Sequence, residues 1–207
     1  MPNISVVRAD ETDADEVTAV LSAGFHQDPV SGWIFPDEAD RVRLHPPFFR
    51  PFVELTLAEG AIWTTPDRAA VALWLPVDVT AHGDGPDLRS LYEPLLGAYH
   101  AERIGAFDTR SSANHPTHTN HQYLPFVAVR PERLGEGLGT ALLTDRLADL
   151  DRQGVPSYLE ASNERSAKLY ARLGYAHLDV TTDLPGGPTL YPMWRDPARR
   201  EADEPTN

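Results

Sequence analysis

Residues 133–143, RLGEGLGTALL, place three glycines at alternate positions directly before a helical pattern. Gly135, Gly137 and Gly139 allow main-chain N–H groups to come close to a ligand, and a helix N-terminus adds unpaired donors and a partial positive charge. The spacing differs from the G-x-G-x-x-G of dinucleotide-binding folds, and no lysine follows as it does in a P-loop. The stretch therefore favours a main-chain cradle for a pyrophosphate, with a ligand-free strand-to-helix turn as the alternative.

The composition limits the classes of protein to which the chain can belong. Its 207 residues, 41% of them hydrophobic, are enough for one globular domain with a sizeable core. The net charge of -13 opposes nucleic acid and anionic membranes as partners, since both attract basic surfaces. The absence of cysteine excludes disulfides, thiolate zinc sites and a cysteine nucleophile.

Two further expectations concern domain organisation and location. Residues 1–198 are expected to form a single domain, and the polar, aperiodic residues 199–207 a disordered tail. The first ten residues lack the apolar segment of a signal peptide, and no stretch approaches the roughly 18 apolar residues of a membrane span. A cytoplasmic protein is the default expectation.

The pattern along the chain predicts an α/β fold with a mixed sheet of about six or seven strands flanked by helices. In the first half it predicts a strand over residues 4–9, a helix capped at Thr12 and ending near Asp28, a helical region broken by three prolines, a hairpin around Pro66-Asp67, and one helix over residues 88–107. In the second half it predicts a loop over residues 111–122, a strand over 123–129, a helix ended by Gly154, a strand over 156–162, a helix capped by Ser162 or Asn163, and two last strands.

Pro125 lies inside the strand expected over residues 123–129. Because proline cannot donate to a strand ladder, it indicates a bulge, an edge, or a place where the sheet opens. The strand is therefore not expected to be fully paired.

Two separate segments together resemble the signature of the GNAT superfamily of acyl-CoA-dependent N-acyltransferases. They are VAVRPERLGEGLGTALL, residues 127–143, and LEASNERSAKLYARLGY, residues 159–175. Within the superfamily the chain is most similar to the puromycin N-acetyltransferases, through VRAD, GF followed by DP, AVALW, YLEAS and PGGP. One position departs from the pattern: Leu134 stands where the family usually has glutamine or arginine.

The resemblance implies a GNAT fold, with the sheet splayed in the middle at Pro125, and acetyl-CoA as co-substrate. The implied contacts are the main chain of Val127, Ala128 and Val129 for the pantetheine arm, residues Arg133, Leu134, Gly135, Glu136, Gly137, Leu138, Gly139 and Thr140 around the pyrophosphate, and Asn163 and Tyr170 further along the cofactor. It further implies that Tyr170, a phenol with an ordinary pKa of about 10, protonates the departing thiolate. A core tyrosine is the alternative.

The acceptor amine must be neutral to attack a thioester, so a base is expected. Glu160 is the first candidate, with a structural salt bridge as its alternative, and His121 is the second. Asp28 and Trp33 are expected in the acceptor pocket, for charge and for aromatic stacking. His115, His118 and His121 recur at every third position, but in a loop this spacing is not expected to bring the rings together, and no metal is predicted.

These features predict an acetyl-CoA-dependent N-acetyltransferase that acts on a small-molecule primary amine, possible examples being aminonucleoside antibiotics in resistance or self-protection. A peptide or protein N-acetyltransferase and a non-catalytic acyl-CoA sensor are the alternatives, because a shared fold does not choose a substrate. Exposed edge strands leave both monomer and homodimer open.

Overall fold

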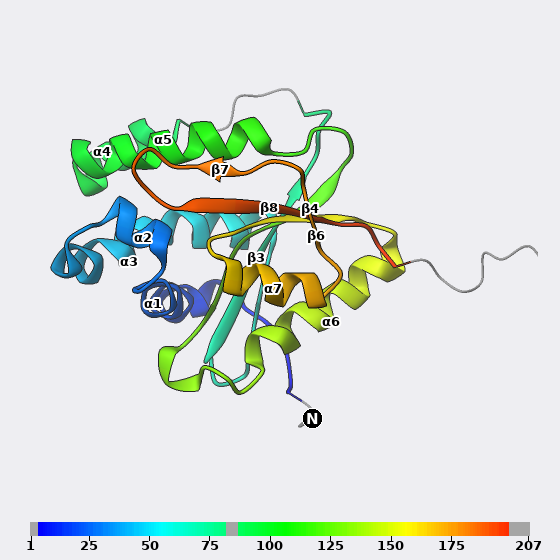
Figure 1. Ribbon diagram of the computed structural model, residues 1–207. Coiled ribbons are helices and arrows are strands. Elements are labelled where there is room, and N and C mark those ends of the chain that lie inside the picture. Colours follow the sequence, from blue (N-terminus) through cyan, green and yellow to red (C-terminus); the bar gives the residue numbers. More distant parts are fainter. Residues whose placement is uncertain (1–3, 82–86, 199–207) are drawn as a thin grey trace, which may run out of the picture.

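The computed structural model describes residues 4–81 and 87–198 as a mixed sheet between two layers of helices (Figure 1). The tail expected over residues 199–207 lies outside the described residues. Within the described ranges, no helix is both long and apolar enough to cross a bilayer.

The α/β prediction is confirmed, with eight strands rather than six or seven. They run in the order β1-β2-β3-β4-β5-β8-β6, and β7 pairs with β8 beside this path. Among the strands that the structure describes, only β4 and β5 are parallel neighbours. The strands are β1 Val7–Arg8, β2 Ala61–Thr64, β3 Ala70–Val77, β4 His121–Val129, β5 Ser157–Ala161, β6 Ala176–His177, β7 Thr182–Asp183 and β8 Thr189–Arg195.

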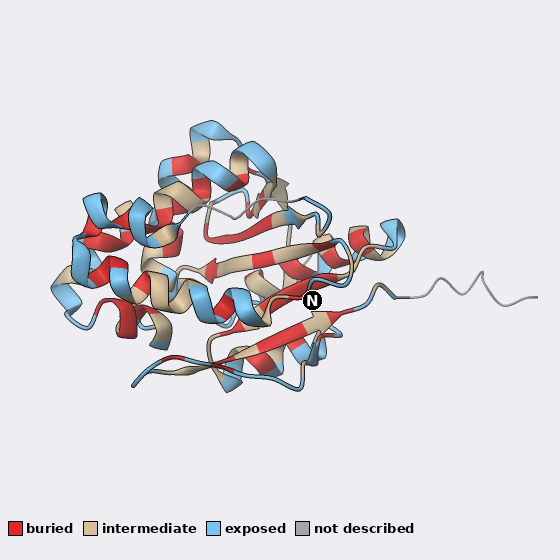
Figure 2. Cartoon of the chain, turned by 90° about the horizontal axis from the view of Figure 1, so that it is seen from above, coloured by how far each residue is buried: buried red, intermediate tan, exposed pale blue. Residues whose placement is uncertain are grey.

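Seven α-helices flank this sheet among the described residues. They are α1 Ala14–Gly24, α2 Pro29–Ile34, α3 Glu38–Glu59, α4 Leu88–Leu96, α5 Ala98–Asn114, α6 Leu138–Gln153 and α7 Glu164–Arg172, with short 3-10 turns at Glu11–Asp13 and Pro131–Arg133. Helices α1 to α5 share one core with Val71 and Leu73 of β3, and α6 and α7 share a second core with Trp74 and Leu159. Figure 2 shows buried residues along the strands and on the inward sides of the helices.

The prediction that prolines break the second helical region is wrong. Helix α3 runs unbroken through Pro46, Pro47 and Pro51, although each proline removes a backbone donor. One face of the helix is buried, and His45 joins it to its neighbours, with Nδ1 3.0 Å from the Ser22 carbonyl oxygen and Nε2 2.5 Å from Ser31 Oγ. This tertiary packing offsets the lost helical hydrogen bonds.

Other boundaries differ for local reasons. The single helix expected over residues 88–107 is two helices, because Gly97 adopts φ +85° between α4 and α5. Asp10, not Thr12, caps the first helical segment by accepting from the Thr12 N–H at 2.9 Å. Asp28 marks the beginning of α2 rather than the end of α1, and it accepts from the N–H groups of Val30 and Ser31. The hairpin expected around Pro66-Asp67 is confirmed between β2 and β3.

The sheet opens between β4 and β5, as the proline indicated. Their pairing is limited to Gln122 with Ser157 and Tyr123 with Tyr158, and it stops just before Pro125. On the other side of β4, the register with β3 shifts between Leu73 and Leu75. Pro125 therefore lies in a bulge, and the rest of β4 has a free edge toward β5.

Candidate active site

The glycine loop leads from β4 through the turn Pro131–Arg133 into α6. Gly135 and Gly137 have φ of +88° and +82°, and Gly137 is the N-cap of α6 in the left-handed conformation. Side chains rarely adopt this backbone, so the two glycines are needed for the shape of the loop. Gly139 does not have a positive φ, and a Cβ there would meet Val129 Cγ2 at 3.4 Å.

The loop presents a continuous row of main-chain donors. Among the described residues, no acceptor bonds the six N–H groups from Gly135 to Thr140, and the first intrahelical bond runs from the Ala141 N–H to the Gly137 carbonyl at 2.9 Å. Gly135, Glu136 and Gly137 are exposed to solvent. Six free donors at the N-terminus of a sixteen-residue helix form an anion-binding surface. Such a surface suits an anion of the pyrophosphate kind.

Arg133 is bound by carboxylates of the protein itself. Its guanidinium donates to Glu136 at 2.8 Å and to Asp67 of the β2–β3 turn at 2.8 Å. These hydrogen bonds hold the pKa of Glu136 below its usual range. Glu136 therefore turns to Arg133, and the anion surface relies on main-chain dipoles.

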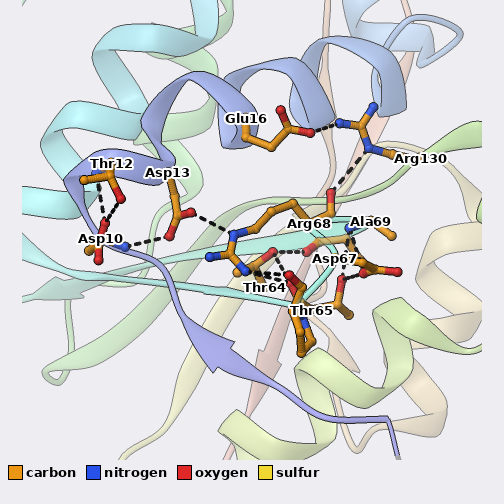
Figure 3. A network of polar contacts seen from close by, with 12 residues as sticks. Asp10, Thr12, Asp13, Glu16, Thr64, Thr65, Asp67, Arg68, Ala69 and Arg130 are labelled. Carbon is orange, nitrogen blue, oxygen red and sulfur yellow. Dashed lines mark hydrogen bonds and ion pairs between the residues drawn. The ribbon is translucent and has the colours of Figure 1, made fainter.

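A second set of ion pairs fixes the hairpin under the loop (Figure 3). Arg68 donates to Asp13 at 2.8 Å, and Arg130 bonds to Glu16 of α1. Arg130 also donates to the Arg68 carbonyl oxygen at 3.4 Å. These contacts tie the start of the glycine loop to α1 and to the β2–β3 turn.

The free edge of β4 presents only part of its predicted cofactor segment. The Arg130 N–H donates to the Ala69 carbonyl at 2.8 Å, and in an antiparallel pair the residues that bond to the partner alternate. Ala128, opposite Val71, therefore turns its main chain toward β3. Val127 and Val129 turn theirs toward the opening, where an extended ligand can pair with them.

Asn163 caps a helix, and the two leucine side chains of the glycine loop, Leu134 and Leu138, differ in exposure. Asn163 is the N-cap of α7: its Oδ1 accepts from the Ser166 N–H at 2.9 Å, and its Nδ2 donates to Ser162 Oγ at 3.2 Å. The side chain of Leu134 is 63% exposed, whereas Leu138 packs in the core under α6.

Tyr170 lies on the buried face of α7, with its ring 6.0 Å from that of Tyr175. Its hydroxyl makes no hydrogen bond within the described residues. Burial raises the pKa of Tyr170 well above its usual value, and the nearby Tyr175 and Asp28 raise it further. Its pKa is therefore not the ordinary one that was expected, and the phenol stays protonated at neutral pH.

An apolar cavity of about 90 Å³ opens beside the splayed strands. Aromatic and aliphatic side chains form most of its wall, and two carboxylates, Asp28 and Glu160, face into it. The remaining lining residues are Phe25, Val30, Ser31, Ile34, Phe48, Phe49, Phe52, Leu88, Ile104, Phe107, Tyr123, Pro125, Phe126, Ser162 and Leu190. A larger open groove of about 640 Å³ lies between α1 and α3, but no residue of β4, β5 or the glycine loop lines it.

Both carboxylates in the cavity are held by neutral donors. Glu160 accepts from Ser111 of α5 and from Thr182 Oγ1 at 2.9 Å. Asp28 accepts from Ser162 Oγ at 2.5 Å, besides the two N–H groups that it caps. Burial raises the pKa of both carboxyls above the usual range, although these hydrogen bonds act in the opposite direction. The predicted alternative for Glu160, a salt bridge with an arginine, is absent from the described residues.

Trp33 and His121 do not line the cavity. Trp33 packs against Gly187, donates from Nε1 to the Pro185 carbonyl at 3.1 Å, and lies 4.6 Å beneath the guanidinium of Arg103. It fixes the β7–β8 connection and is not placed to stack on a ligand in this cavity.

His121 begins β4 and is buried beyond Tyr123, with its Nε2 3.0 Å from His115 Nε2. The expectation that the loop histidines stay apart is wrong for this pair, whose ring centroids are 5.1 Å apart. His118 instead packs on Trp194. No group of three or more potential ligands able to hold a metal is found in residues 4–81 and 87–198.

Four residues of the site were not predicted as site residues. Ser111 and Thr182 reach Glu160 from α5 and β7, and Ser162 reaches Asp28 from the end of β5. Only Tyr123, two residues before the proline on the same strand, had a position from which its role as a wall residue could be inferred.

Comparison with known proteins agrees with this geometry. Residues 90–175 match the Acetyltransferase (GNAT) family. The chain is 28% identical to a mycothiol acetyltransferase of Nocardioides sp. over 87% of this chain and 52% of that protein, and 32% identical to one of Streptomyces avermitilis over 61% and 48%. The chain thus spans about half the length of these curated relatives.

Solved structures match over nearly the whole chain. One is described as histone acetyltransferase HPA2 and related acetyltransferase from Corynebacterium glutamicum, with 25% identity, a TM-score of 0.68, and coverage of 97% of this chain and 99% of that one. Another is arylalkylamine N-acetyltransferase 2 from Aedes aegypti, with 16% identity, a TM-score of 0.69 and coverage of 95% and 100%, a likeness of fold. The chain therefore has the α/β fold of the GNAT acetyltransferases, and residues 90–175 match the model of that family.

Proposed function

We propose that this protein transfers the acetyl group of acetyl-CoA to the primary amine of a small molecule with an apolar or aromatic body. The observation that carries the proposal is the cavity beside the splayed strands β4 and β5, where Asp28 and Glu160 face an otherwise mostly apolar wall without a cationic partner among the described residues. A buried carboxylate attracts an ammonium group, and aromatic walls attract a flat apolar one.

The co-substrate has a matching surface next to this cavity. The free N–H groups from Gly135 to Thr140 suit a pyrophosphate, and the open edge at Val127 and Val129 suits an extended amide-bearing arm. The glycine loop follows the C-terminal end of β4, and the cavity is lined by Tyr123, Pro125 and Phe126 further back along the same strand. Tyr170 lies on the helix that flanks the same opening.

The chemistry then needs three proton transfers. Glu160 takes a proton from the ammonium group, which leaves a neutral amine to attack the thioester carbonyl directly in a ternary complex. The carbon–sulfur bond breaks as the amide forms, Tyr170 gives its proton to the departing thiolate, and the second proton that the nitrogen loses restores the phenol of Tyr170. The raised pKa of Glu160 makes it a stronger base than an exposed glutamate.

The identity of the acceptor is the finer part of the proposal. An aminonucleoside antibiotic such as puromycin has an amine and flat rings, which fits the apolar wall, and resistance or self-protection would then be the role. The mycothiol acetyltransferases to which the chain is similar instead suggest an acceptor related to mycothiol. Both acceptors belong in one test.

The test measures release of free CoA from acetyl-CoA at about pH 8 over a panel of amines. The panel contains puromycin, other aminonucleosides, arylalkylamines, polyamines, the acceptor of the mycothiol enzymes, amino acids and short peptides. Turnover of a small amine supports the proposal, and turnover of peptides alone favours a protein N-acetyltransferase. No turnover in a sample that binds acetyl-CoA by calorimetry would contradict the enzymatic proposal in favour of an acyl-CoA sensor.

A further inference from the structure

We propose that Ser111, Thr182 and Asn114 are positioning residues that hold Glu160 in its ionised form and aim it at the acceptor. The inference rests on the proposed function, because it concerns the base of that reaction. The three residues lie in α5 and β7, outside the glycine loop and outside the two segments that resemble the GNAT signature.

The directions of the hydrogen bonds follow from the donors and acceptors present. The Asn114 amide lies 3.2 Å from the Thr181 carbonyl oxygen, which can only accept, so Asn114 Nδ2 is the donor. The same nitrogen donates to Thr182 Oγ1 at 3.0 Å. Since Thr182 Oγ1 accepts from Asn114, its one hydroxyl hydrogen is directed to Glu160 Oε1 at 2.9 Å. Asn114 therefore orients the hydroxyl of Thr182, and this hydroxyl donates to the carboxylate of Glu160.

Ser111 supplies the second donor, to the other carboxylate oxygen of Glu160. It is 7% exposed, belongs to α5, and donates to Glu160 Oε2. Each carboxylate oxygen thus accepts one hydroxyl and keeps a further lone pair for the cavity. The two donors fix the plane of the carboxylate and stabilise its charge.

No other group near Glu160 supplies that charge stabilisation. Within the described residues no lysine, arginine or histidine forms an ion pair with it. Its other titratable neighbours are Tyr123 of β4 and Tyr158 of β5, whose pKa values are raised by burial and by the charge of Glu160. Asp28 faces the same cavity, and Asp108 of α5 lies near Tyr123. The tyrosines are neutral and the acids repel, so the hydroxyls are the groups that favour the ionised Glu160.

The experiment compares the pH dependence of kcat/KM for wild type, Thr182→Val and Ser111→Ala. Thr182→Val keeps the shape of the side chain and removes the donor. The acid limb of the profile, where activity rises with pH, should move up by about one pH unit in each variant, because an unassisted carboxyl holds its proton to higher pH. Thr182→Ser should restore the wild-type limb.

Matched control variants distinguish the shift of the acid limb from a general loss of structure. Thr181→Val and Ser112→Ala change exposed neighbours that do not touch Glu160, and should leave the limb in place. Thr182 is 1% exposed, so a melting curve is taken for each variant. If Thr182→Val does not fold, Ser111→Ala carries the test alone. If the acid limb of the kcat/KM profile does not move in a folded Thr182→Val or Ser111→Ala variant, the inference is wrong.

A second readout distinguishes this inference from the proposed function. Carboxyl ¹³C NMR of glutamate-labelled protein follows the titration of Glu160, whose signal is assigned by its loss in Glu160→Gln. An upward shift of that titration in Ser111→Ala or Thr182→Val supports the positioning set whether or not Glu160 is the base. Wild-type turnover by Glu160→Gln would refute Glu160 as base, whereas an unmoved NMR titration would refute the positioning set.

Discussion

Two alanine substitutions in the glycine loop, at positions two residues apart, should have different effects on the free energy of unfolding. Gly137→Ala places a side chain at φ +82°, a left-handed backbone that costs an L-residue about 1 kcal/mol. A Cβ there would have only Ile4 Cδ1 nearby, at 4.0 Å, so nothing packs against it to offset this cost. For a chain of 207 residues, 1 kcal/mol lowers Tm by about 2–4 °C.

Gly139→Ala should instead be neutral or stabilising. Gly139 lies in the first turn of α6 without a positive φ, and its added Cβ would touch Val129 Cγ2 at 3.4 Å, an ordinary contact. Alanine restricts the unfolded chain, which contributes about 0.5 kcal/mol of stability. The new methyl points at Val129 and leaves the N–H groups accessible.

Urea and thermal unfolding measure both stabilities, and calorimetry measures acetyl-CoA binding. Gly137→Ala should also weaken acetyl-CoA binding, because a relaxed loop turns its N–H groups away from the anion, whereas Gly139→Ala should bind as wild type. Equal changes in Tm for the two variants would refute the argument from backbone conformation. Unchanged acetyl-CoA binding by a destabilised Gly137→Ala would refute the role assigned to the loop.

Three further substitutions test the candidate site and an ion pair outside it. Tyr170→Phe should lower kcat at least tenfold and leave the Kd for acetyl-CoA unchanged, because the ring remains and only the proton donor is lost; an unchanged kcat would exclude Tyr170 as the acid. Asp28→Asn keeps the cap of α2 but removes a charge from the cavity, so KM for an amine acceptor should rise about tenfold, equivalent to about 1.4 kcal/mol, with little change in Tm. Asp151 receives two bonds from Arg195, at 2.7 and 2.8 Å, which lower the pKa of the carboxyl, so Asp151→Asn should cost about 2 kcal/mol at pH 7. Because the folded-state pKa is depressed, that stabilisation is present above the ordinary value of 3.8 and is lost as pH falls below it, and urea unfolding at pH 7 and pH 3 should show the difference shrink.

Local sequence patterns predicted those features of the site that depend on the conformation of the main chain. The alternate glycines indicated a tight loop before a helix, and Pro125 indicated a bulge, an edge or an opening of the sheet, because neither feature depends on distant residues. The same is true of Asn163 as the cap of α7. In contrast, three prolines suggested a broken helix, yet α3 persists because its buried face packs against α1 and α2.

The cavity and its carboxylates were decided only by the tertiary structure. Asp28 and Glu160 are 132 positions apart in the chain, and nothing local states that both face one apolar space or that Ser111, Thr182 and Ser162 are their donors. Trp33 and His121 fit the predicted pocket by sequence position, but side-chain packing turns them to Gly187 and His115 instead. The sequence alone thus determined the glycine loop before α6 and an irregularity of the strand at Pro125, because these follow from backbone chemistry within a few residues. Which side chains meet where the sheet opens depends on how five helices close over one face of the sheet, and this is a property of the folded chain.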